Sequence, residues 1–316
     1  MDDIASLMRS PTLDAIDRAI VGNEHSEPSP FVRCSSLGKC ERLQWYQFRW
    51  CGEPEAFEAR ILRIFDTGNV EEDRMVNWLQ RAGIDVAPVD PKTGDQFIVS
   101  FANGHCKGHT DGEATGIIEA PVTPHLIECK THNAKSFAQL VKHGVAISKP
   151  DHMAQMQIYM HGRGLTRAFY LAKNKDTDDL YAERVKYDPA HAMALEAKAE
   201  RIATSPRPLA RISDDPAFFE CRFCHLNQLC HIGAAVARNC RTCLHSSPVM
   251  DPKYPGDWLC ARHNRFLALD DQRAGCPNHL FIPDLIGGEQ TDADEHAETV
   301  TYRMADGSTF IDGAKS

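Results

Sequence analysis

The sequence lacks the features that mark membrane, secreted and nucleotide-dependent redox proteins. It has no run of about 18 consecutive apolar residues, the length that a membrane-spanning helix requires. Its first residues, MDDIASLMRS, are acidic and carry no basic-then-apolar secretion signal, so we expect a cytoplasmic location and no membrane partner. No flavin or nicotinamide fingerprint, internal repeat or extended low-complexity segment is present. These absences favour an ordinary globular protein.

An excess of positive charge is also missing, because 44 Asp and Glu outnumber 35 Lys and Arg and give a net charge of −9. Many nucleic-acid-binding proteins are basic, so this balance argues against a uniformly basic surface. The charge is uneven, however. Residues 130–186 hold ten Lys or Arg and five Asp or Glu, whereas residues 288–316 hold two and seven. A local basic face therefore remains compatible with a nucleic-acid partner.

Hydrophobic periodicity predicts a mixed α/β sheet flanked by helices. We expect helices at residues 6–20, 41–50, 66–83 and 147–164 and from Asp188-Pro189 onward, where Asp caps and Pro begins the helix. We expect short strands at residues 96–102, 106–114, 116–120, 125–131 and 167–174, and a hairpin at 299–312. The aromatic residues between 45 and 50 are expected to fill the core.

Two carboxylates and a lysine form the first candidate site. Glu128 and Lys130 lie two apart on a predicted strand, so their side chains point to the same face. Asp111 precedes them by sixteen intervening residues, on another predicted strand between Gly108 and Gly112. Carboxylates at adjacent strand ends suit Mg²⁺ or Mn²⁺, and a neighbouring lysine would stabilise charge on a phosphate. The pattern predicts metal-assisted hydrolysis of a phosphodiester.

Two further pairs accompany this trio. Gly68 and Glu72 form G-x3-E on a predicted helix, and Gln155 and Tyr159 form Q-x3-Y, whose spacing places both on one helical face. In this order the motifs resemble the PD-(D/E)XK nuclease superfamily, in particular its RecB-like exonuclease branch. The resemblance implies a restriction-endonuclease-like fold.

The same resemblance implies roles for individual residues. Asp111 and Glu128 would bind the metal, with the Cys129 carbonyl as a further ligand. Lys130 would be the catalytic lysine. Gln155 and Tyr159 would position Lys130 or the DNA backbone, and Glu72, which stands where many relatives have histidine, would be an outer metal ligand.

Twelve cysteines are present, and their close spacing indicates metal binding rather than disulfides. Cys221, Cys224 and Cys230 are spaced C-x2-C-x5-C and need a fourth ligand, for which Cys40, Cys34 or a nearby histidine is available. With Cys40, the set resembles the iron–sulfur nucleases of the same superfamily, including CRISPR-associated adaptation nucleases and AddB-type enzymes. There a [4Fe–4S] cluster ties the ends of the nuclease domain together. The same thiolates also suit zinc.

A second set comprises Cys240, Cys243, Cys260 and Cys276, with two, sixteen and fifteen intervening residues. This spacing suits a small four-thiolate zinc module, in which His245, His263 or His279 is near enough to replace one cysteine. It is similar to cysteine-rich appendages of phage-encoded proteins, for which the location would be the host cytoplasm. The module would be structural, or would bind DNA or a protein partner.

These motifs predict a nuclease domain at residues 1–236, a zinc module at 237–287 and an acidic tail at 288–316. The expected activity is that of a Mg²⁺- or Mn²⁺-dependent deoxyribonuclease, an exonuclease of recombination or repair. The alternative is a non-catalytic DNA-binding or adaptor protein on the same scaffold. DNA ends or single strands are the expected partner, together with homo-oligomers, since toroidal assemblies occur among relatives.

Overall fold

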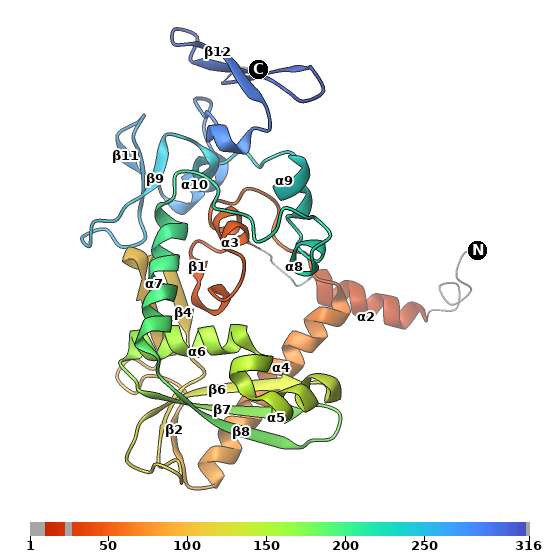
Figure 1. Ribbon diagram of the computed structural model, residues 1–316, viewed down its shortest axis with the longest axis vertical. Helices are drawn as coiled ribbons and strands as arrows, with labels where there is room; N and C mark the ends of the chain where they lie inside the picture. Colours follow the sequence, from red (N-terminus) through yellow and green to blue (C-terminus); the bar gives the residue numbers. More distant parts are fainter. Residues whose placement is uncertain (1–9, 23–26, 314–316) are drawn as a thin grey trace.

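A five-stranded mixed sheet forms the lower half of the molecule in the computed structural model, which describes residues 10–22 and 27–313 (Figure 1). Its order is β2-β5-β6-β7-β8, and only β6 and β7 run parallel. The strands are β2 (Asp85–Ala87), β5 (Glu113–Thr115), β6 (His125–His132), β7 (Arg167–Asn174) and β8 (Leu180–Lys186). The expected mixed α/β architecture is confirmed.

Helices cover both faces of this sheet. The long helix α4 (Ala59–Arg81) packs Met75, Val76 and Leu79 on one face, against Ile127 and other residues of the sheet. The opposite face is covered by α5 (Ala134–Ser148) and α6 (Pro150–Arg163), beyond which lie α3 (Glu41–Phe48) and α7 (Pro189–Thr204) (Figure 1). Helix α2 (Pro11–Gly22) extends to one side, and the part of the predicted helix before Ser10 lies outside the described residues.

Three predicted elements differ in the structure. The helix expected over 147–164 begins only at Pro150 as α6, because Lys149 leaves the helical conformation before that proline. Residues 147 and 148 instead end α5, a helix that was not expected. The strand expected over 116–120 is a turn that starts at Gly116, whose φ is 85°. Asp111 was expected on a strand, but it lies between β4 (Cys106–His109) and β5. Strand β8 was not expected.

Three small sheets lie outside the five-stranded sheet, one near the middle of the molecule and two in its upper half (Figure 1). One contains β1 (Val32–Arg33), β4 and β3 (Ile98–Phe101), and another contains β9 (Ser246–Pro248), β10 (Trp258–Cys260) and β11 (Arg265–Phe266). The third contains β12 (Glu289–Asp294), β13 (Thr299–Arg303) and β14 (Thr309–Asp312), and it includes the predicted hairpin. Short helices α8 (Phe219–Arg222), α9 (Asn227–Ile232) and α10 (Leu269–Ala274) join them, with single turns at η1 (Cys34–Ser36), η2 (Ala102–Gly104), η3 (Cys240–Thr242) and η4 (Pro283–Leu285).

The cysteine-rich segment shares a core with helices α3, α6 and α7. Trp258 is fully buried and contacts Phe48, with ring centroids 5.3 Å apart. Two buried arginines stack on the same aromatic cluster: Arg241 lies 4.6 Å and Arg49 5.0 Å from the Trp258 ring. Their guanidinium groups donate to backbone carbonyls, among them Phe48 O at 2.8 Å from Arg241 and Arg241 O at 3.1 Å from Arg49. The aromatic residues thus fill a core, as expected.

His105 lies in this core and predicts a loss of stability in acid. It is almost fully buried beside Phe48 and Trp258, and burial lowers its pKa to about 4. The unfolded chain, with a histidine pKa of about 6.5, binds the proton first as the pH falls. The stability contributed by neutral His105 is therefore complete above about pH 6.5 and disappears towards pH 4, about 3 kcal/mol in all.

Urea unfolding of wild type and His105→Phe at several pH values between these limits measures this contribution. Other buried histidines titrate in both proteins, so the difference between the two pH profiles isolates His105. We expect the variant to have the shallower profile. Parallel profiles would show that His105 takes up its proton without loss of stability.

Within the described ranges, no helix is both long and apolar enough to cross a bilayer.

Candidate active site

The three residues of the predicted trio lie together where β6 meets the turn before β5. The Lys130 ammonium forms an ion pair with the fully buried Glu128 carboxylate, and its Nζ lies 3.7 Å from Asp111 Oδ2. The same Nζ donates to the Cys129 carbonyl at 3.1 Å, while the Cys129 N–H donates to Asp111 Oδ2 at 2.9 Å. The single ammonium group of Lys130 therefore contacts both carboxylates and the Cys129 carbonyl.

Glycines on either side of Asp111 allow this approach. Gly112 has φ 141°, and a Cβ there would lie 2.8 Å from the Ala87 carbonyl oxygen. A Cβ on Gly108 would lie 2.6 Å from Cε1 of Tyr159. A side chain at either position would displace the backbone turn or the tyrosine. The glycines thus hold Asp111 close to β6 and Tyr159 close to β4.

Helix α6 contributes the other polar groups from above the sheet. Gln155 Nε2 donates to Glu128 Oε2 at 3.1 Å, which fixes the orientation of the carboxylate. Tyr159 is buried one turn further along, where burial and the nearby Glu128 raise the pKa of its hydroxyl above the usual value. Tyr159 therefore keeps its hydroxyl proton. The Q-x3-Y pair is brought to the site as the sequence indicated.

Helix α4 brings Glu72 to the same place. Burial and the neighbouring charge of Asp111 raise the pKa of Glu72 to about 7. Burial likewise raises the pKa of Glu128 to about 8, although Lys130 opposes the shift. For Lys130, burial is outweighed by Glu128 and Asp111, so its pKa lies above the usual value. Three carboxylates thus share a single ammonium group.

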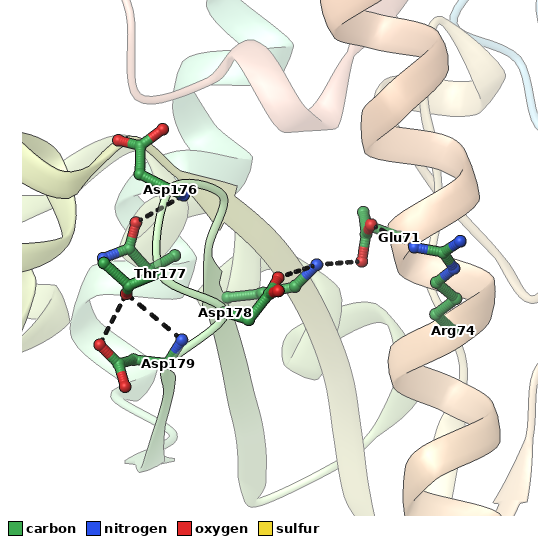
Figure 2. Close-up of polar contacts among 8 residues, drawn as sticks. Glu71, Arg74, Asp176, Thr177, Asp178 and Asp179 are labelled. Carbon is green, nitrogen blue, oxygen red and sulfur yellow. Dashed lines mark hydrogen bonds and ion pairs between the residues drawn. The ribbon is translucent and has the colours of Figure 1, made fainter.

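The preceding residue, Glu71, anchors α4 to the sheet (Figure 2). Its carboxylate lies 2.9 Å from Lys173 Nζ on β7, and both side chains are nine-tenths buried. Lys173 also contacts Asp178, at 2.7 Å, in the acidic loop between β7 and β8. The other oxygen of Glu71 accepts from the exposed Arg74 at 2.8 Å. The Glu71–Lys173 ion pair fixes the turn of α4 that carries Glu72.

Lys173→Met is expected to destabilise the protein by about 3 kcal/mol, because it leaves the buried Glu71 carboxylate without its buried partner. Arg74→Ala is the matched control, since it removes the exposed partner of the same carboxylate and should cost less than about 1 kcal/mol. Urea unfolding monitored by tryptophan fluorescence measures both. Equal losses would show that the buried ion pair contributes no more than the surface pair.

Comparison with protein-family models and with curated proteins finds no match. Among solved structures, the chain is similar to an alkaline exonuclease (LHK-Exo) from Laribacter hongkongensis, with a TM-score of 0.40 and 17% identity over 60% of this chain and 90% of that chain. LHK-Exo in complex with dAMP also gives 0.40, with 16% identity over the same shares. The crystal structure of SSO0001 gives 0.38, with 13% identity over 69% and 95%. Similarities this distant carry no functional conclusion.

The first cysteine set gathers around one pocket. Cys40, Cys221, Cys224 and Cys230 all line a cavity of 580 Å³ between the start of α3 and the segment containing α8 and α9. Burial, then the neighbouring Cys40 and Cys230, raise the pKa of the Cys221 thiol. Cys34 lies elsewhere, with its sulfur 3.4 Å from that of Cys106. The geometry therefore favours Cys40 as the fourth member.

The second cysteine set is also clustered. Burial raises the pKa of Cys240 to about 11, with further contributions from Cys276, Cys243 and Cys260. The 3-10 turn η3 places Cys240 and Cys243 together, and the β9–β10 pairing brings Cys260 beside them. Among the three candidate histidines, His263 lies 3.8 Å from the Cys276 sulfur. His279 instead contacts Thr242 Oγ1, at 3.2 Å.

Among the residues that the structure describes, no three His, Cys, Asp or Glu side chains lie close enough together to hold a metal ion. The donor sets nevertheless fit their expected ions. At the carboxylates, burial raises the pKa values of Glu72 and Glu128 and the charge of Asp111 adds to both shifts, so a bound cation would favour their ionised forms. In the cysteine sets, burial and then the neighbouring thiols raise the pKa values of Cys224 and Cys243, and a bound cation would favour their thiolate forms.

Proposed function

We propose that this protein is a metal-dependent DNA nuclease, and that it acts as an exonuclease in recombination or repair. The supporting observation is the arrangement of Lys130, which pairs with Glu128 and Asp111 and also donates to the Cys129 carbonyl. Oxygen donors beside a lysine are the equipment for hydrolysis of a phosphodiester.

Each side chain has a defined part in this reaction. Asp111, Glu128 and the Cys129 carbonyl would hold Mg²⁺ or Mn²⁺, with Glu72 as an outer ligand, and the ion would supply Lewis-acid charge to the phosphate and the attacking water. Lys130 would stabilise the negative charge that develops on the phosphate. Gln155 keeps Glu128 oriented through its hydrogen bond. Tyr159 offers its hydroxyl proton to the same site.

The cysteine sets support this activity without taking part in it. Cys40 with Cys221, Cys224 and Cys230 would hold a [4Fe–4S] cluster, or zinc in its place, and so join α3 to the segment that follows α7. Cys240, Cys243, Cys260 and Cys276 would hold zinc and stabilise the small sheet packed around Trp258. We also propose that this zinc module binds a protein partner or that the chain assembles with copies of itself.

Digestion of linear and closed circular DNA by anaerobically purified protein tests the proposal. We expect linear DNA to be degraded from its ends with Mg²⁺ or Mn²⁺ and to survive with a chelator, while circular DNA stays intact. Cleavage of circular DNA would show that the protein is an endonuclease and not an exonuclease. Binding of DNA without cleavage in either metal would instead support the non-catalytic alternative.

A further inference from the structure

A chain of hydrogen bonds runs beside the carboxylate site and is not used by the mechanism above. Lys149 Nζ, at the start of α6, lies 2.6 Å from Ser136 Oγ, which lies 3.1 Å from His132 Nδ1. His132 Nε2 is 2.9 Å from the hydroxyl of the fully buried Tyr170. The same hydroxyl is 2.9 Å from Nδ1 of His152 on α6. Five side chains from α5, β6, β7 and α6 are thus linked in series.

The lysine at the head of this chain sets the direction of every bond. An ammonium group only donates, so Ser136 accepts from Lys149 and donates its own O–H to the unprotonated Nδ1 of His132. His132 then carries its proton on Nε2 and donates to Tyr170, which donates to His152 Nδ1. The reverse order would leave the Ser136 proton without an acceptor and set the dipoles of the chain against the Lys149 charge. His152 consequently carries its proton on Nε2.

The far end of the chain is an unpaired donor. His152 is partly exposed, and within the described residues its Nε2 forms no hydrogen bond, although this atom carries the proton. It lies on α6 one turn before Gln155, which contacts Glu128. The hydrogen bond to Tyr170 therefore fixes the orientation of the His152 ring on the helix that also carries Gln155.

Positive charge surrounds this donor. Burial, followed by Lys130, His132, Lys149 and Lys39, lowers the pKa of His152 to about 3. Burial, followed by Lys149, Lys130 and Lys175, lowers the pKa of His132 to about 4. Both rings are therefore neutral at physiological pH, so the tautomers assigned above apply. Asp151 is the acidic neighbour, at the first turn of α6. A neutral N–H among lysines suits an anionic oxygen.

We propose that His152 Nε2–H, with Lys39 and Lys149, binds a non-bridging oxygen of a DNA phosphodiester adjacent to the one that is cut. This inference rests on the proposed nuclease function and names a substrate contact for it. Ser136, His132 and Tyr170 are positioning residues, because they act on the phosphate only through His152. Because α6 carries both His152 and Gln155, which contacts Glu128, a phosphate next to the one at the proposed metal site is the anion expected at His152.

The tautomer of His152 gives a test that does not depend on activity. In full-length protein with ¹⁵N-labelled histidine, long-range ¹H–¹⁵N correlation spectra distinguish protonated from unprotonated ring nitrogens, and His152→Gln and His132→Gln assign the signals. We expect both histidines to carry the proton on Nε2. Ser136→Ala should weaken this preference at both rings. A proton on Nδ1 of His152 would overturn the proposal.

DNA binding tests the contact itself. With Ca²⁺ in place of Mg²⁺, fluorescence anisotropy with a labelled duplex carrying a single-stranded overhang measures affinity without requiring cleavage. We expect His152→Ala to bind roughly 10-fold or more weakly, as for loss of a hydrogen bond to a charged group, while His152→Gln keeps an N–H donor and recovers part of the affinity. His143→Ala, on the exposed side of α5, is the matched control.

The outcomes separate this inference from the nuclease assignment. Equal affinity of His152→Ala and wild type would overturn the phosphate contact, even if wild type cleaves DNA. A wild type that binds DNA but does not cleave it would remove the nuclease assignment, while a loss of affinity in His152→Ala alone would still support the contact. Equal losses of DNA affinity in His152→Ala and His143→Ala would overturn the proposed contact, because the effect would then not be specific to His152.

Discussion

Lys130→Ala is expected to reduce DNA cleavage by roughly 10²- to 10⁴-fold, with Mg²⁺ or Mn²⁺ in excess. The ammonium group pairs with Glu128 and lies within reach of Asp111, so its removal takes away the positive charge nearest the proposed metal ligands. The buried Glu128 would then depend on a bound divalent ion for compensation. We therefore also expect added Mg²⁺ to raise the Tm of the variant more than that of wild type.

Lys135→Ala provides the control for this prediction. Lys135 is exposed on the first turn of α5, so its loss removes one lysine of the same segment without touching the carboxylates. Initial rates on end-labelled linear DNA, together with melting curves in chelator and in Mg²⁺, measure both variants. If Lys130→Ala and wild type cleave at equal rates, the active site is not where we propose it.

Cys221→Ser is expected to remove the metal of the first cysteine set and to lower stability by roughly 3–5 kcal/mol, or about 10 °C in Tm. A serine cannot replace a thiolate ligand, and the pocket joins segments that lie far apart in the chain. Anaerobic purification, metal analysis and a visible spectrum would measure the loss. Wild type should contain iron with a charge-transfer band, and the variant should lack both while retaining zinc at the second set.

Cys51→Ala is the matched control, because Cys51 is fully buried but belongs to neither set. Its substitution should cost about 1 kcal/mol through lost packing and leave the metal content unchanged. If the wild type is colourless and contains two zinc ions, the first cysteine set binds zinc and not an iron–sulfur cluster, and the nuclease proposal is unaffected. Unchanged metal content and Tm in Cys221→Ser would contradict any metal at this pocket.

The sequence by itself determined the features that depend on neighbouring residues. Asp188 caps α7 through bonds from the Ala190 and His191 N–H groups, as the Asp-Pro pair indicated. The two-residue spacing of Glu128 and Lys130 on β6 placed them on one face, because side chains alternate along a strand. Pro150 was itself a sequence signal for the start of α6, because a proline disfavours the helical conformation in the residue before it. The hydrophobic periodicity on both sides nevertheless suggested one continuous helix.

Only the tertiary structure decided which distant segments meet. Glu72 reaches Asp111 because α4 is anchored by the Glu71–Lys173 ion pair, and local periodicity does not specify such a contact. The choice of Cys40 over Cys34 likewise follows from their positions around the pocket and not from spacing.

The hydrogen-bond chain that ends at His152 most clearly separates what local sequence determines from what tertiary packing determines. It joins α5, β6, β7 and α6, whose residues have no shared sequence pattern, and it exists because the parallel pairing of β6 with β7 places Tyr170 beside Glu128. Local sequence fixed each element and the face that each side chain occupies. The packing of those elements, driven by burial of their apolar faces, decided which polar groups came within hydrogen-bonding distance.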